Sequence, residues 1–389
     1  MRRLFLTAWA ALTVGCAPAT NPGVREDEVV LGMTAPLTGP AAAWGSVALG
    51  ARAWAEEVNA LGGVHGRRVR LVVRDDGYAP GRALAQLSAL KDSVLAVLGP
   101  VGTAVLQASH LPLAEAGVPV VCPFGNPRVF VGRGSTARVF SIYPDYRGEG
   151  ELLGAHCVVF AGARRVAVFY QNDDFGKEGL FGLRRGLEAA GGSLVAAVPY
   201  EAQERELGTH ALRLRGSRAE ALVLFSTTAH AARLVRELAR NGQRPAIFAS
   251  FTLSDRHVMF SLLGPLWAGA RFDARGPIRG EAAADRIIAR LLARDPRLRG
   301  REGFALEGAL AMMVAVEGLQ RAGRGLDRAS FVAALESLRE WAPEGLGAPI
   351  SFAPGRHHGL NALRLMQAGR RAEDPPRELA PWRYMPPLF

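Results

Sequence analysis

The stretch RRVAVFYQNDDFGKEGLFGLRRGLEAAGGSLVAAVPY, residues 164–200, alternates apolar runs with a helical pattern in one short pass. The run at 165–170 and the run at 194–199 are rich in β-branched and apolar residues, which favours strands. Between them Leu180, Leu183 and Leu187 recur at helical spacing, and Gly191-Gly192 follow as a stop signal. Two strands joined through a helix pair in parallel, by a right-handed crossover.

The same alternation extends in both directions along the chain. Amphipathic stripes predict further helices at 45–60, 230–241 and 305–322. Repeated strand–helix units predict an α/β fold class, with parallel sheets covered by helices on both faces. All the expected strands lie at 29–33, 69–74, 94–98, 118–121, 165–170, 194–199, 221–225 and 246–249.

Three segments interrupt this pattern, and 389 residues are enough for two domains. The segments are FSIYPDY (140–146), RFDARGPIRG (271–280) and APISF (348–352). We interpret them as passages of the chain between two α/β lobes. The Pro-rich tail after residue 370 is expected to be irregular.

Residues 1–16, MRRLFLTAWAALTVGC, have the organisation of an export signal: two arginines, a short apolar run and small residues. The apolar run is too short for a permanent membrane span. Gly15-Cys16 resembles a bacterial lipobox, which implies lipidation at Cys16. The alternatives are a soluble secreted product, or a disordered N-terminus with a chance cysteine. Residues 17–27 are expected to form a flexible tether.

Composition excludes several classes of function. The net charge is +11, but the arginines are scattered along expected helices and alternate with glutamate, so a nucleic-acid surface is not indicated. Cys122 and Cys157 favour buried thiols over a disulfide, although export would permit one. No Cys/His cluster has metal-ligand spacing, and no GxSxG, P-loop or HExxH motif occurs.

Ligands of open parallel sheets bind beyond the carboxyl ends of the strands, so the residues that follow each strand are the candidate site. Thr103 follows the turn GPVG and begins a helix, where free N–H groups and a hydroxyl suit a carboxylate. Its alternative interpretation is a plain N-cap. Aromatic residues after strands can enclose an apolar ligand, or serve only packing. They are Trp44, Phe124, Phe175 and Phe251, and the hydroxyl-rich ends at 226–228 and 250–252 add Thr228 to the candidates.

Three polar pairs receive structural interpretations. Asp75-Asp76 and Asp173-Asp174 follow strands, and adjacent acids point in different directions, so turn and helix-cap roles are favoured over acid–base or metal chemistry. His357-His358 has no acidic or cysteine ligand nearby in sequence, and a surface loop is expected.

At these residues the chain resembles the substrate-binding proteins of branched-chain amino-acid ABC transporters, the leucine/isoleucine/valine-binding protein family. The resemblance implies two Rossmann-like lobes joined by a three-strand hinge that closes on the ligand, the type I periplasmic binding protein fold. It implies an N-terminal lobe of residues 28–142 plus 276–347, and a C-terminal lobe of residues 143–275 plus 348–389. The similar segments are 29–45, 56–80, 98–109, 116–127, 164–180, 233–248 and 350–360.

The resemblance also implies roles for individual residues. Thr103 would bind the ligand carboxylate, and Trp44 would line the pocket. Phe175 replaces a tyrosine of the family. Phe124 or Gly125 stands where members that bind amino acids have a threonine for the ligand ammonium, and Ser250–Thr252 lacks their acid. A buried ammonium without an anionic partner costs several kcal/mol. An apolar or aromatic carboxylate, or an amide, is therefore favoured over a plain α-amino acid.

The expected function is an extracytoplasmic binding protein of an ABC importer, which binds a small hydrophobic or aromatic carboxylate, an amide or an amino-acid-like ligand in the cleft between the lobes by hinge closure. Its expected partners are a small ligand, the permease and ATPase subunits, and the membrane through a lipid anchor, in the periplasm or on the outer face of the cell membrane. No cofactor, metal, catalysis or nucleic acid is expected. Two alternatives are a ligand-sensing module of the same fold that acts on a signalling partner, and an exported α/β enzyme.

Overall fold

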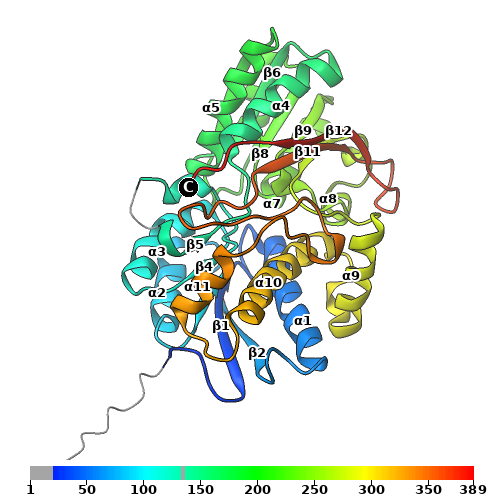
Figure 1. Ribbon diagram of the computed structural model, residues 1–389. Coiled ribbons are helices and arrows are strands. Elements are labelled where there is room, and N and C mark those ends of the chain that lie inside the picture. Colours follow the sequence, from blue (N-terminus) through cyan, green and yellow to red (C-terminus); the bar gives the residue numbers. More distant parts are fainter. Residues whose placement is uncertain (1–20, 133–135) are drawn as a thin grey trace, which may run out of the picture.

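The computed structural model describes residues 21–132 and 136–389. The expected export signal and Cys16 lie outside the described residues. Two sheets form the cores of two lobes, stacked one above the other in Figure 1. Among the described residues no helix is long and apolar enough to cross a membrane.

The first lobe is built on a five-stranded parallel sheet in the order β2-β1-β3-β4-β5. Leu31 of β1 lies between Leu71 of β2 and Ala96 of β3, so apolar side chains meet in register. The strands are β1 (Glu28–Ala35), β2 (Arg68–Asp75), β3 (Ala96–Leu98), β4 (Val120–Val121) and β5 (Val139–Phe140). The helices are α1 (Ser46–Ala60), α2 (Pro80–Leu90), α3 (Thr103–Glu115), α9 (Ala282–Arg294), α10 (Glu302–Ala322) and α11 (Arg328–Glu336).

The second lobe has a seven-stranded sheet in the order β12-β11-β10-β9-β8-β6-β7. Neighbours from β7 to β10 pair in parallel, whereas β11 and β12 are antiparallel additions at one edge. The strands are β6 (Arg165–Gln171), β7 (Ser193–Tyr200), β8 (Ala221–Phe225), β9 (Ala246–Ala249), β10 (Arg271–Ala274), β11 (Ala362–Gln367) and β12 (Arg377–Tyr384). The helices are α4 (Tyr146–Ala161), α5 (Asp174–Ala189), α6 (Gly208–Ser217), α7 (Thr228–Arg240) and α8 (Arg256–Leu263).

Three passages connect the lobes, near the expected breaks. They run through residues 141–145 between β5 and α4, 275–281 between β10 and α9, and 353–361 before β11. The second break was placed too early, because residues 271–274 form β10 inside the second sheet.

The expectation of an irregular tail after residue 370 is wrong. Residues 377–384 form β12, the red edge strand of Figure 1. Pro381 is compatible with a strand here because the pairing with β11 shifts register next to it, and edges and bulges tolerate the missing N–H.

The expectation of a surface loop at His357-His358 is also wrong, because both side chains are buried. His357 stacks on Phe140 with 4.2 Å between ring centroids, and its ring nitrogens contact the Thr136 carbonyl and the Glu336 carboxylate. Local sequence did not reveal this, because the third passage is covered by segments that are distant in sequence.

Candidate functional site

A cavity lies between the two lobes, where the carboxyl ends of strands from both sheets face each other. The volume of this cavity is about 30 Å³, and the cavity is partly open to solvent. Four of the residues expected from sequence lie on its wall: Trp44, Thr103, Phe124 and Phe175. The full lining is Ala41, Trp44, Tyr78, Val101, Gly102, Thr103, Phe124, Tyr143, Tyr146, Phe175, Ser226, Thr227 and Thr252.

The first lobe contributes the start of α3. Gly102 precedes the helix with a φ of 110°, a conformation that favours glycine, and no side chain caps the helix. The first backbone N–H groups of α3 therefore have no side-chain cap and are available to a ligand. The Thr103 hydroxyl accepts a hydrogen bond from the backbone N–H of Asn126 at 3.2 Å and can still donate its proton. Gly125 packs against this turn but is not on the cavity wall.

A chain of aromatic rings forms the apolar wall. Phe124 lies 6.3 Å from Trp44 and 6.2 Å from Tyr143, centroid to centroid, and Tyr146 lies 4.6 Å from Phe175. Phe251 does not line the cavity. Its ring stacks on Tyr146 at 5.7 Å and meets Tyr143 edge-on at 4.9 Å, so it supports both tyrosines from behind.

The second lobe contributes hydroxyl groups at the start of α7. Ser226 and Thr227 line the cavity, whereas Thr228 is the first helical residue and lies off the wall. The Tyr200 hydroxyl holds this turn, because it accepts from the Ser226 hydroxyl at 3.1 Å and from the Thr227 N–H at 2.9 Å. No side chain caps α7, so each lobe presents one uncapped helix start to the cavity.

No lining residue carries a charge. The nearest acid to the loop 250–252 is one that sequence reasoning missed, Glu149 of α4. Its carboxylate accepts from the Ser250 hydroxyl at 3.0 Å and from the Phe251 N–H at 2.7 Å, behind the aromatic wall. Burial raises the pKa of Glu149 to about 8. This carboxyl group therefore serves the loop rather than the cavity.

The tyrosine hydroxyls on the wall remain neutral. Burial raises the pKa of Tyr78, Tyr143 and Tyr146 above the ordinary value, so each keeps its proton and can donate it. The arrangement offers hydroxyls, backbone N–H groups and aromatic faces, which suit binding rather than proton transfer.

Hydrogen bonds cross the cavity and hold the lobes together. The Trp44 indole N–H donates to the Thr252 carbonyl at 3.1 Å, and the Gln171 amide donates to the Tyr78 hydroxyl at 3.2 Å. The Gln107 amide donates to the Asp174 carboxylate at the rim. The structure thus represents the closed arrangement of the two lobes.

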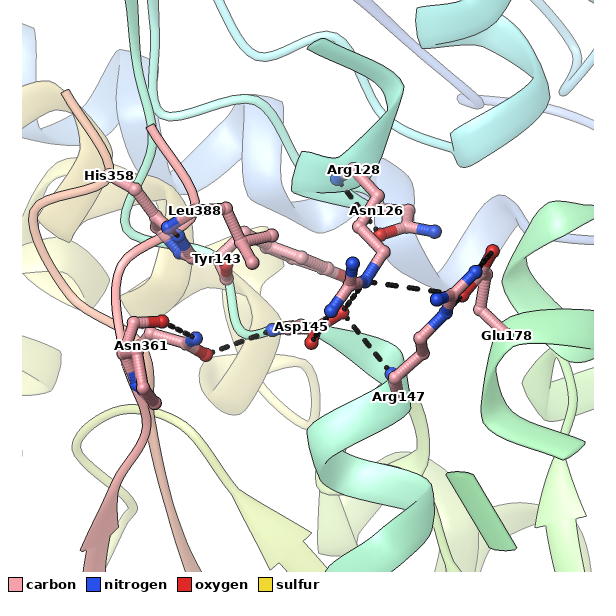
Figure 2. Close-up of polar contacts among 10 residues, drawn as sticks. Asn126, Arg128, Tyr143, Asp145, Arg147, Glu178, His358, Asn361 and Leu388 are labelled. Carbon is pink, nitrogen blue, oxygen red and sulfur yellow. Dashed lines mark hydrogen bonds and ion pairs between the residues drawn. The ribbon is translucent and has the colours of Figure 1, made fainter. Parts of the chain in front are cut away.

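A polar network supports the floor of the cavity (Figure 2). Asp145 begins the network: it accepts two hydrogen bonds from Arg128, both at 2.7 Å, and caps α4 through the Arg147 N–H. Arg147 in turn pairs with Glu178 of α5. Arg128 of the first lobe also lies 4.0 Å from the Glu178 carboxylate of the second lobe, so this ion pair connects the lobes.

The three tyrosines of the wall were not predicted from the sequence. Tyr78 follows β2 in the turn DDGY, so the rule of strand ends would have found it. Tyr143 and Tyr146 belong to the passage FSIYPDY, which was interpreted only as a connection. In a two-lobed fold, a passage between the lobes necessarily runs beneath the cleft, and its aromatic residues were the signal.

The remaining sequence interpretations concern structural roles. Asp75 accepts from Thr38 and Gly77, Asp76 accepts from the Tyr78 N–H, and Asp173 caps α5, which confirms turn and cap roles.

Cys122 and Cys157 are buried free thiols. In the part of the chain that the structure describes, no group of three or more His, Cys, Asp or Glu residues could hold a metal ion.

Comparisons with known proteins agree with this geometry. A protein family described as "Periplasmic binding protein" matches residues 28–373. The Leu/Ile/Val-binding protein homolog 3 of Brucella melitensis is 27% identical and covers 91% of this chain and 92% of its own length. The Leu/Ile/Val-binding protein BraC3 of Rhizobium johnstonii is 25% identical, with 86% and 89% covered.

A solved structure shares the fold over nearly the whole chain. The fatty acid ABC transporter substrate-binding protein from Thermomonospora curvata superposes with a TM-score of 0.84 at 20% identity, covering 94% of each chain. At this identity the similarity concerns the fold alone.

Proposed function

We propose that this chain, which belongs to the periplasmic binding protein family, binds a small apolar carboxylate or amide between its lobes and delivers it to an ABC importer. The chain is a binding protein and not an enzyme, like the Leu/Ile/Val-binding relatives. Family membership also implies an extracytoplasmic location.

The observation that supports this ligand class is a cavity between the closed lobes whose lining has aromatic faces and hydroxyls but no charged side chain. A carboxylate would be stabilised at the start of α3, by the Thr103 hydroxyl, backbone N–H groups and the positive end of the helix dipole. The apolar part of the ligand would lie among Trp44, Phe124 and Tyr143. An amide would use the same donors, and its NH₂ group would find the hydroxyls of Ser226 and Thr227.

The same lining disfavours a plain α-amino acid. A ligand ammonium in the cavity would meet no carboxylate, because no acidic residue lines it and Glu149, which accepts from residues 250 and 251, lies off the lining. Leaving such a charge unpaired costs several kcal/mol. Leucine, isoleucine and valine, the ligands in the relatives' names, are therefore the critical competitors.

A thermal-shift screen on residues 17–389 tests the proposal. A ligand at about 100 times its Kd stabilises the fold by about 2.7 kcal/mol, which is visible as a higher melting temperature. The panel compares leucine, isoleucine and valine with aromatic carboxylates, short fatty acids, amides and urea. Shifts confined to compounds without an ammonium group would support the proposed class. A shift with leucine or valine would contradict it.

We further propose that the chain is exported and held at the membrane by lipid on Cys16. The proposal rests on the residues before Cys16, and metabolic labelling tests it. A fatty-acid probe should label the full chain, and the Cys16→Ser variant should remain unlabelled. Equal labelling of both would contradict the anchor.

A further inference from the structure

Residues 385–389 follow the edge strand β12 and run back to the hinge, where the C label stands in Figure 1. The family match covers residues 28–373, so this 385–389 segment lies outside the matched residues. It begins at the sheet of the second lobe. At its far side the Phe389 ring meets Phe130 of the first lobe edge-on at 5.9 Å.

The 385–389 segment binds the third passage through four hydrogen bonds. The His358 N–H donates to the Phe389 backbone oxygen at 2.8 Å, and the Leu388 N–H donates to Nδ1 of His358 at 3.1 Å. The Met385 N–H donates to the Asn361 carbonyl, and the Asn361 amide donates to the Pro386 carbonyl, both at 2.8 Å. The Phe389 ring also stacks on His358 at 5.7 Å.

The same two side chains, His358 and Asn361, bind the first passage with their opposite ends (Figure 2). Nε2 of His358 donates to the Tyr143 carbonyl at 2.9 Å. The Asn361 amide oxygen accepts from the Asp145 N–H at 3.0 Å. These two contacts lie at the cavity tyrosines. The acceptor is the carbonyl of Tyr143, which is on the wall, and the donor is the N–H of Asp145, which directly precedes Tyr146.

We propose that the 385–389 segment connects the lobes by non-covalent contacts, in addition to the three passages of the chain. We propose further that His358 and Asn361 are positioning residues, which bind this segment and thereby fix the positions of Tyr143 and Tyr146. His358 can serve both neighbours only as the neutral tautomer with its proton on Nε2, since Nδ1 must accept from Leu388. Asn361 is suited for the same reason: its amide has one accepting and one donating end.

Leu388 and Phe389 contact the His358 ring, and the ring is buried. Burial lowers the pKa of His358 to about 4. The groups that face His358 from the packed elements are the Tyr143 carbonyl and the Asp145–Arg128 ion pair. The charges of Asp145 and Arg128 shift the pKa of His358 in opposite directions. Removing the cover of residues 386–389 should therefore raise the pKa of His358 toward its ordinary value of about 6.5.

Deletion of residues 386–389 gives the first test, and it needs no ligand. Hydrogen exchange should become at least tenfold faster at the amides of Ser141, Asp145 and Gly359, with no change in β1. Tyr384→Ala is the matched control, because this exposed ring belongs to the same edge strand, and it should leave all rates unchanged. Unchanged rates at Ser141 and Asp145 after the deletion would overturn the proposal, as would an equal acceleration in β1.

A pair of His358 variants and a titration give the second test. His358→Gln keeps a donor toward the Tyr143 carbonyl, whereas His358→Asn keeps an acceptor toward Leu388. With ¹³C-labelled tyrosine, assigned by Tyr143→Phe, the Tyr143 resonance should stay in place in the Gln variant and move in the Asn variant. Equal behaviour of both variants would overturn the positioning role. So would an imidazole that still titrates near pH 4 after the deletion.

Discussion

Thr103 combines two roles at the start of α3. Its hydroxyl oxygen accepts from the Asn126 N–H, which fixes the turn. Its hydroxyl proton can be donated to a ligand in the cavity that Thr103 lines. We expect Thr103→Val to weaken binding of a carboxylate ligand at least tenfold, because a hydrogen bond to a charged group contributes about 1.5–3 kcal/mol. Thr103→Ser should retain affinity within a few-fold in calorimetric titration. Equal losses in both variants would show that the hydroxyl is not the donor.

Asp76 shows how a turn residue affects stability. Burial raises its pKa to about 6 from 3.8, so the folded state holds the proton more tightly than the unfolded state. The stability that this proton gives is fully present below pH 4 and is lost as the pH rises through 6.

We therefore expect Asp76→Asn to be more stable than the parent chain at pH 8, by up to about 3 kcal/mol, and similar at pH 4. Urea unfolding at both pH values measures this difference. Contributions of other buried acids, such as Glu149, cancel between the two chains. A constant difference at both pH values would show that the effect is not one of titration.

At the scale of elements, α10 begins without a side-chain cap of its own. Asp255, the N-cap residue of α8 in the other lobe, accepts from the Phe304 N–H at 3.0 Å and from the Val258 N–H at 3.2 Å. One carboxylate thus caps two helices across the cleft. The contact joins the two lobes in this structure, and we expect it to stabilise the closed state.

Gly303 permits this approach, since a Cβ atom there would lie 2.8 Å from Cγ of Asp255. We expect Gly303→Ala to prevent full closure and to weaken ligand binding at least tenfold, while the melting temperature of the free protein changes little. Gly216→Ala in α6 is the control, because a Cβ there meets nothing within 4 Å. Unchanged affinity in Gly303→Ala would contradict the role of this cap in closure.

For the whole molecule, hydrogen bonds across the cavity connect Trp44 to Thr252 and Tyr78 to Gln171. These bonds are few, and hinge proteins shift between open and closed populations according to their ligand. Small-angle X-ray scattering of the free protein should give a larger radius of gyration than the closed structure. A saturating ligand should reduce it to the closed value. A radius that is equal with and without ligand would contradict ligand-driven closure.

The sequence by itself determined the alternation of strands and helices, because the apolar spacing typical of each element is present within its own residues. The strand at 165–170 and the helix stripe of Leu180, Leu183 and Leu187 need no distant partner to be recognised. The same reasoning placed Trp44, Thr103, Phe124 and Phe175 at strand ends, and the structure brings them together. A parallel sheet makes this possible, since all its carboxyl ends share one edge.

Only the tertiary structure decided which side chains face the cavity and which stand behind it. Phe251 and Tyr143 are both aromatic residues in segments that connect a strand to a helix, yet one supports the wall that the other forms. The burial of His358, the edge strand β12 and the cap from Asp255 to α10 likewise depend on segments far apart in the chain. Their partners depend on how distant segments of the two lobes pack, and the local spacing of residues in the sequence does not predict that packing.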